Sequence, residues 1–164
     1  MKALYALEGG VAGAAALTLI HESIKRAIPG APRMDLLGMN ALSKGLKVLG
    51  AKTPDERKLY GLSLTGDIIS NSLFYSFAGI GNKENALARG AGLGLLAGLG
   101  AVLLPKPFGL PEGPSARTTE TKLLTIGLYV AGGLVAAAVM KWLDRKKHKQ
   151  NKDWEQKLVT SSMA

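Results

Sequence analysis

The sequence predicts an all-α, polytopic integral membrane protein with four transmembrane helices and a short amphipathic surface helix. Four long apolar segments contain almost no charge, and a membrane-spanning helix needs about 20 mostly apolar residues. The strands of a membrane barrel would alternate apolar and polar residues, and the helices of a soluble bundle would carry polar stripes at helical spacing. None of the four segments alternates apolar and polar residues, and the last one carries no polar stripe. We therefore expect helices in lipid.

The predicted spans are residues 3–20, 61–80, 86–104 and 123–140. The first contains one charged residue, Glu8, and the second contains Asp67. The third contains Arg89 close to its start, and the fourth has no charge. The first span resembles a signal peptide in its small residues, but Glu8 interrupts the apolar core that such a peptide needs. We therefore expect residues 3–20 to remain as a helix.

Local signals mark where these helices begin and end. Thr53 is expected to cap a helix that starts at Pro54. Gly81 supplies a left-handed stop, and Asn82 is expected to cap the next helix. Four prolines between residues 105 and 114 predict a non-helical link, after which Thr118 or Thr119 caps the last helix. Residues 1–140 then form the transmembrane domain, and residues 141–164 form a basic C-terminal tail.

The link between the first two spans contains an amphipathic helix at about residues 35–49. Its apolar side chains fall on one side of a helical projection, while Lys44 and Lys47 fall on the other. Such a helix suits the membrane surface. It could equally pack on the ends of the other helices, because both arrangements bury the same face.

Composition excludes several functional classes. The 164 residues include no cysteine, so the chain has no disulfide, thiolate metal site or thiol nucleophile. The net charge of +9 would favour nucleic acid in a soluble chain. Here the basic residues gather in the tail and the first link, so we expect no nucleic acid partner and instead contact with anionic lipid headgroups. The residues expected to make that contact are Lys44, Lys47, Arg145, Lys146, Lys147 and Lys149.

Charge alone orients the chain poorly, because basic residues are divided almost equally between the two sides of the predicted membrane. The dense basic run at residues 145–149 directly follows the last span. A basic cluster beside a membrane helix favours the cytoplasmic, anionic leaflet. We therefore expect both termini on the cytoplasmic side of an inner or plasma membrane.

Small residues recur every fourth position along one face of several spans. This glycine-zipper pattern lets helix backbones approach closely in lipid. The pattern predicts close packing, within one chain or between subunits. The predicted packing residues are Gly9, Gly13, Gly90, Gly94, Gly98, Gly132 and Gly133.

Ionisable residues inside the predicted spans are costly, and they normally have a partner or a task. In antiparallel spans, Glu8 and Arg89 fall at a similar depth and are expected to pair. Asp67 lies near the opposite side, close to His21 and Glu22, and shares a helix face with Asn71 four residues later. The candidate polar residues are Glu8, His21, Glu22, Asp67, Asn71 and Arg89.

Two interpretations of these polar residues stay open. They can form structural pairs, with Asp67 bound to Lys122 or His21. Alternatively, Glu8 and Asp67 can carry protons or cations, because a carboxyl group in a low dielectric can hold its proton near neutral pH. No metal-binding or catalytic motif is present in the sequence, and we expect neither a cofactor nor a metal.

The function that the sequence favours is non-enzymatic. We expect a small membrane bundle that associates with itself or serves as a subunit of a larger membrane assembly. A proton- or cation-coupled transporter or channel is the first alternative. An enzyme that acts on lipid headgroups is the second, with His21, Glu22 and Asp67 near the headgroup. The sequence leans away from an enzyme.

Overall fold

The computed structural model describes residues 3–162, except for the side chains of residues 148–149, 151–153 and 155–162. The chain is 82% helical, and residues 3–162 contain no strand, which confirms the all-α part of the predicted fold class. Two short 3₁₀ turns, Phe77–Gly79 and Lys83–Asn85, join the third and fourth helices. The helices are α1 (Ala3–Ala27), α2 (Met34–Val48), α3 (Glu56–Ser76), α4 (Ala86–Leu103), α5 (Gly113–Ala116) and α6 (Thr119–Ser162).

Three segments of the described chain are long and apolar enough to cross a membrane: Ala3–Ala27, Lys83–Leu103 and Thr119–Lys147. They are consistent with a membrane location. Helix α3 does not join them, although the sequence predicts a fourth span at residues 61–80. Asp67, Asn71 and several serines interrupt its apolar residues and lower its mean hydropathy.

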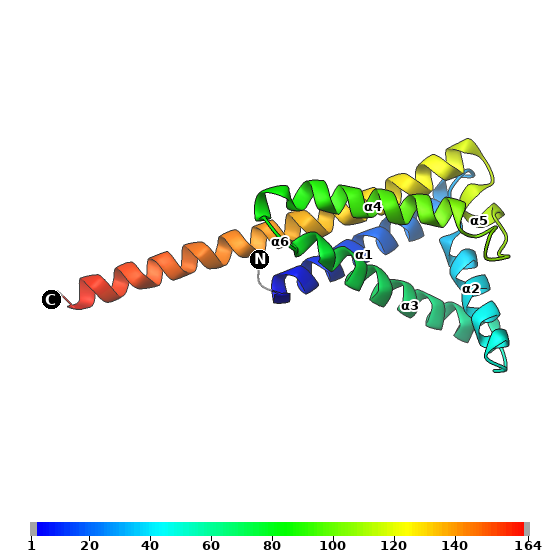
Figure 1. Ribbon diagram of the computed structural model, residues 1–164, viewed down its shortest axis with the longest axis horizontal. Helices are drawn as coiled ribbons and strands as arrows, with labels where there is room; N and C mark the ends of the chain where they lie inside the picture. The colour runs from blue at the N-terminus through cyan, green and yellow to red at the C-terminus, as the bar shows by residue number, and fades with distance from the viewer. Residues whose placement is uncertain (1–2, 163–164) are drawn as a thin grey trace.

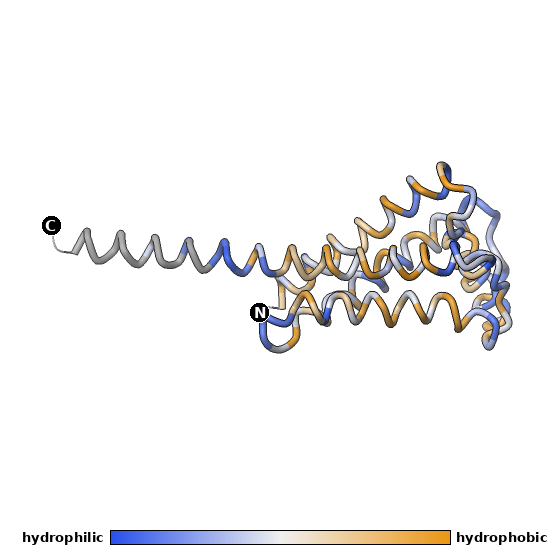
Figure 2. The backbone as a smooth tube through the Cα atoms, turned by 90° about the horizontal axis from the view of Figure 1, so that it is seen from above, coloured by the Kyte–Doolittle hydropathy of each residue, from blue (hydrophilic) through white to orange (hydrophobic). Residues whose placement is uncertain are grey.

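The helices run alternately up and down, and α3 leans out of the bundle. Helix α6 packs along α1 and α4, and α1 also packs against α3. Figure 1 shows α3 and α4 meeting near the end of the bundle where the chain begins and diverging toward the other end, like the arms of a V. Helix α2 stands across the wide end of this V (Figure 1). In Figure 2, apolar residues follow the long helices, and hydrophilic residues gather in the connections at that wide end.

Glycines make the contact between α4 and α6 close. Gly90 lies against the backbone of Gly133, and Gly94 lies against Tyr129 and Val130. A Cβ atom at Gly98 would lie 2.7 Å from the Cα of Ile126, so no larger residue fits without moving a helix. The same closeness joins α1 to α6, where Gly9 faces Met140 and Ala136, and Gly13 faces Gly132 and Ala136.

Tyr75 fills the narrow end of the V. Its side chain is fully buried, and its hydroxyl donates a hydrogen bond of 2.8 Å to the carbonyl of Tyr129. Leu17, Leu128 and Met140 surround it in the apolar core. A buried phenol needs such a partner, so this bond joins α3 to α6 at the point where the V closes.

The helix ends are partly as predicted. Helix α3 begins at Glu56, and Asp55 caps it by accepting the Lys58 N–H at 3.0 Å. The prediction of Thr53 was wrong, because the Asp55 carboxylate stands nearer to the free N–H groups of the first turn. Gly81 has the expected positive φ of 81°. Asn82 makes no cap bond with its side chain.

The last helix begins as expected and continues past the predicted span. Thr118 accepts the Thr121 N–H at 3.1 Å through its hydroxyl oxygen. Helix α6 then extends beyond residue 140 to Ser162. Residues 141–162 contain neither glycine nor proline, so nothing in the sequence ends the helix at residue 140.

Candidate functional site

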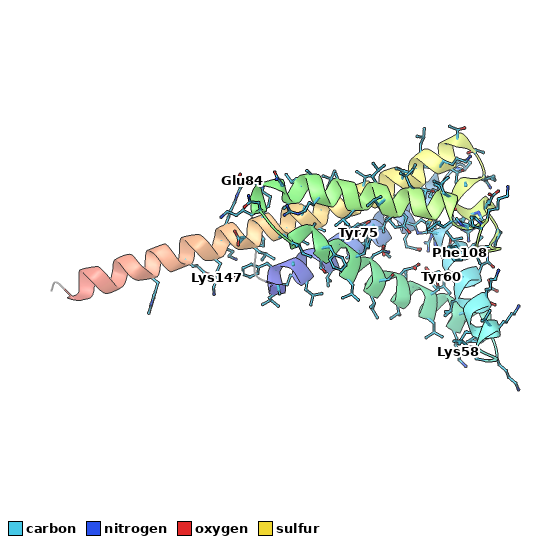
Figure 3. All side chains as sticks on the ribbon, in the orientation of Figure 1. Lys58, Tyr60, Tyr75, Glu84, Phe108 and Lys147 are labelled. Atoms are coloured by element: carbon cyan, nitrogen blue, oxygen red, sulfur yellow. The ribbon has the colours of Figure 1, made fainter. Side chains whose placement is uncertain are left out.

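A groove of about 680 Å³ occupies the opening of the V between α3 and α4. This volume lies within the range of about 300–1,000 Å³ that is typical of small-molecule sites. Small residues of α4, namely Ala97, Gly100 and Ala101, form part of one wall. Phe74 of α3 and Phe108, which follows α4, add aromatic surface. Figure 3 shows Phe108 at the wide end of the V, near α2.

A second, smaller cavity of about 40 Å³ lies beside the groove, between α1, α2, α3 and α6. Because one water molecule needs about 10–15 Å³ of such space, this cavity has room for about three. We call it the polar pocket. Asp67, Asn71, Tyr129 and Met34 line both the polar pocket and the groove. The other residues of the polar pocket are Leu17, Thr18, His21, Glu22, Asp35, Tyr60, Ser63 and Leu64.

Asp67 stands where the two cavities meet. Its side chain forms no ion pair and accepts no hydrogen bond within the described part of the chain. The predicted partners Lys122 and His21 therefore do not bind it. The backbone of Gly38 on α2 approaches closely, since a Cβ atom there would lie 3.0 Å from the Asp67 Oδ2 atom.

Several other polar side chains of α3 bond to their own helix. Thr65 donates to the Gly61 carbonyl at 2.8 Å, and Ser72 donates to the Ile68 carbonyl at 2.6 Å. Ser70 donates to the backbone carbonyl of Asp67 at 3.2 Å. The carboxylate of Asp67 and the amide of Asn71 have no such bond among residues 3–162, and both line the groove.

His21 has a structural role at the turn between α1 and α2. It is buried, and the Met34 N–H lies 3.2 Å from its Nε2 atom. The Pro32 carbonyl lies 3.1 Å from the same nitrogen, so Nε2 accepts from Met34 or donates to Pro32. Either bond engages Nε2, while Nδ1 lies 3.6 Å from the Glu22 Oε1 atom. The described residues contain no group of three metal-ligating side chains.

A network of four charged side chains fixes the start of α2. Lys25 bonds to Glu22 at 2.6 Å and to Asp35 at 3.4 Å. Arg33 donates three further bonds to Asp35, the shortest at 2.8 Å. Burial alone would raise the pKa of Asp35, but the hydrogen bonds from Arg33 and the charges of Lys25 and Arg33 outweigh it and lower the pKa to about 2. Asp35 is therefore ionised at neutral pH.

The predicted pair between Glu8 and Arg89 does not form. The Arg89 guanidinium donates to the Ala78 carbonyl at 3.1 Å and to the Asn82 carbonyl at 2.6 Å. These carbonyls belong to the turn before α4, which is nearer in sequence and leaves Arg89 bound locally. Glu8 is exposed on α1 and lines neither the groove nor the polar pocket.

The basic residues expected at lipid headgroups divide into two sets. Lys44 donates to the Phe108 carbonyl at 2.5 Å and to the Gly109 carbonyl at 3.2 Å, so it ties α2 to the loop after α4. Lys47 is exposed on α2. Arg145, Lys146 and Lys147 are exposed on α6, while the side chain of Lys149 lies outside the described residues.

Sequence reasoning located four residues of the polar pocket, namely His21, Glu22, Asp67 and Asn71. It missed Asp35, Tyr60 and Tyr129. Tyr129 was detectable, because it is a large polar side chain inside the otherwise apolar segment 123–140. Asp35 and Tyr60 carried no such signal, since each lies in a polar stretch.

No protein-family model matches the chain, and neither a curated protein nor a solved structure matches it. The geometry of the two cavities and the surfaces around them therefore give the best indication of function.

Proposed function

We propose that this chain is a non-enzymatic, four-span membrane protein that holds an apolar component of the bilayer in the groove between α3 and α4. One observation carries the proposal: α3 and α4 diverge instead of packing, and the space between them is lined mainly by apolar side chains. Helices in lipid gain stability by close contact. A groove that stays open between two neighbouring helices therefore suits a second component.

The proposal treats α3 as the fourth span. Four of its hydroxyl groups, those of Thr65, Ser70, Ser72 and Ser76, are satisfied by carbonyls of the preceding turn, so these four add little cost in lipid. Its outer surface exposes Leu62, Ile69 and Leu73, each by more than half. Exposed apolar side chains of this kind fit contact with lipid better than contact with water.

In this arrangement α2 acts as the surface helix. Val48 and Leu49 at its end are 79% and 82% exposed, which supports insertion of this end into the membrane interface. Leu37 is buried, and Gly38 rests against Ser63 and Asp67 of α3. The two arrangements expected from sequence are thus compatible, because one face of α2 packs on α3 while its end projects.

A pair of glycine substitutions tests the groove. Gly100→Leu places a side chain in the groove, while Gly92→Leu places one where nothing lies within 4 Å and outside the groove. Native mass spectrometry of detergent-purified protein measures the lipid or other apolar molecule that remains bound. We expect a bound species in the unmodified chain and in Gly92→Leu, and its loss in Gly100→Leu. Equal retention in both variants would refute a site in the groove.

Assembly with other membrane subunits is a second proposal, supported by a different surface. Gly61 and Gly66 on the outer side of α3 have nothing within 4 Å of a Cβ position. They lie beside the exposed Leu62 and Ile69, and small residues among larger apolar ones favour helix association in lipid. Since the chain has no cysteine, a single Gly61→Cys change permits disulfide crosslinking in membranes. A crosslinked dimer or heteromer supports assembly, and an uncrosslinked monomer opposes it.

The same geometry weighs against a proton path through Glu8 and Asp67, because the two carboxylates do not share the groove or the polar pocket. Proton flux into liposomes should be unchanged by Glu8→Gln and by Asp67→Asn. A loss of flux in both variants would restore the transporter as the better proposal.

A further inference from the structure

We infer that the groove takes an amphiphile with a cationic ammonium head, whose head binds Asp67 and whose tail lies along α4. This inference rests on the proposed function and adds the chemistry of the ligand. Its basis is the position of a carboxylate that has no ion pair within the described residues, in a groove lined mainly by apolar side chains.

The charges around Asp67 leave it without a cation. The basic side chains at the end of α1 and in the turn before α2 are already bound: Lys25 by Glu22 and Asp35, and Arg33 by Asp35. The carboxylates of Glu22 and Asp35 thus neutralise the positive charge on that side of the polar pocket. An anionic head would be repelled by the Asp67 carboxylate, and a neutral head would leave that carboxylate either unpaired beside apolar surface or protonated. A cationic head is therefore the complementary one.

Two further polar groups converge on the same position. The amide of Asn71 and the phenol of Tyr129 line both cavities, as Asp67 does. Neither side chain makes a hydrogen bond within the described part of the chain, although the backbone carbonyl of Tyr129 accepts one from Tyr75. Asn71 and Tyr129 can accept hydrogen bonds from an ammonium group. The aromatic faces of Tyr129 and Phe74 favour a cation as well.

The rest of the groove suits an alkyl tail. From Leu96 to Leu104 the groove follows α4 over about 12 Å, at the helical rise of 1.5 Å per residue. Ala97, Gly100 and Ala101 leave room along this wall, and Phe108 and Leu110 cover its far end. The polar head and the apolar tail of one molecule would thus meet the matching parts of one continuous groove.

Binding of three molecules with the same tail tests the inference. Dodecylamine is cationic at neutral pH, dodecanol is neutral and laurate is anionic. The full chain is placed in phosphatidylcholine nanodiscs, and binding above that of empty nanodiscs is measured with isotope-labelled ligand. We compare the unmodified chain with Asp67→Asn, with Gly100→Leu, and with Glu8→Gln as a control that removes an exposed carboxylate elsewhere.

We expect dodecylamine to bind most tightly and laurate least. Asp67→Asn should weaken dodecylamine binding about tenfold or more, as expected for the loss of a charge-assisted contact, and should leave dodecanol binding unchanged. Glu8→Gln should bind like the unmodified chain, and Gly100→Leu should bind neither ligand. This result would support the inference even if Asp67→Asn lowered stability, because dodecanol binding reports an intact groove in the same variant.

Two results would overturn the inference. The first would still allow an apolar binding groove, and the second would not. If dodecylamine and dodecanol bind equally, or if Asp67→Asn changes the binding of neither molecule, the preference for an ammonium head is refuted. Binding of an apolar molecule in the groove would then remain as proposed. If none of the three binds and the chain is dimeric in nanodiscs, a second copy occupies the groove, and the ligand site fails together with its chemistry.

Discussion

Replacing Gly94 with alanine should measure how much the close contact of α4 and α6 contributes to stability. A Cβ atom at Gly94 would lie 2.6 Å from the Cα of Val130, whereas ordinary van der Waals contact begins near 3.4 Å. The neighbouring atoms are backbone and cannot rotate away, so the two helices must separate by roughly 0.8 Å. Overpacking of this kind costs about 1–3 kcal/mol.

Gly92→Ala provides the matched control on the same helix, because nothing lies within 4 Å of its Cβ position. Both changes gain about 0.5–1 kcal/mol from the better helix propensity of alanine. This gain cancels when the two variants are compared, so Gly94→Ala should be about 1–3 kcal/mol less stable than Gly92→Ala. The assay is unfolding by SDS in dodecylmaltoside micelles, followed by circular dichroism. Equal midpoints for the two variants would refute the close packing of α4 on α6.

Three further results are expected. Gly38→Ala should destabilise the chain less than Gly94→Ala does, because the atoms its Cβ would meet, Ser63 Oγ and Asp67 Oδ2, are ends of side chains that can rotate away; SDS unfolding against Gly45→Ala, whose Cβ position has open space around it, measures the loss, and a loss equal to that of Gly94→Ala would contradict this reasoning. Asp35→Asn should lower the melting temperature at pH 7, where the carboxylate is charged. Folding lowers the pKa of Asp35 to about 2, so its contribution to stability is full above the usual pKa near 4 and is lost as the pH falls toward 2. The melting temperatures of the variant and the unmodified chain should therefore converge near pH 2. Thr118→Ala should cost about 1 kcal/mol through loss of the α6 cap, measured by the same unfolding assay, and an unchanged midpoint would contradict that cap.

Most helices could be predicted from sequence because each is specified by its own residues. The prediction of a non-helical link was wrong at α5, because Pro114 stands in the first turn of that short helix, where proline is tolerated, and the helical course of residues 141–162 was not predicted. Hydropathy located the apolar segments, and Gly81 and Thr118 marked real ends. The amphipathic link was also predictable, since α2 covers Met34–Val48. These features depend on neighbours within a few residues, which a single sequence displays directly.

The arrangement of the helices was harder to predict, because it depends on contacts between distant segments. Depth alone paired Glu8 with Arg89, but the guanidinium found backbone carbonyls in its own turn. The same reasoning paired Asp67 with His21 or Lys122, although the site brings His21 near Asp67 without a bond between them. Depth places residues at one level of a membrane. It does not say which direction each side chain takes around its helix.

The groove itself had no signature in the sequence. The small residues Ala97, Gly100 and Ala101 resemble the packed positions Gly90 and Gly94, yet the first three line an open space and the other two contact α6. The difference arises from the angle of α3, which Tyr75 fixes at the narrow end of the V.

The position of α2 also determines how a ligand would reach Asp67. Helix α2 lies across the wide end of the V (Figure 1), and the loop containing Phe108 is tied to it through Lys44. If α3 spans the membrane as proposed, the route from water is covered and the remaining approach is sideways from the lipid. Occupancy would then follow the concentration of the molecule in the bilayer, where amphiphiles accumulate, rather than its concentration in solution. A weak contact at Asp67 would suffice for a filled groove, and exchange would proceed at the pace of lateral diffusion.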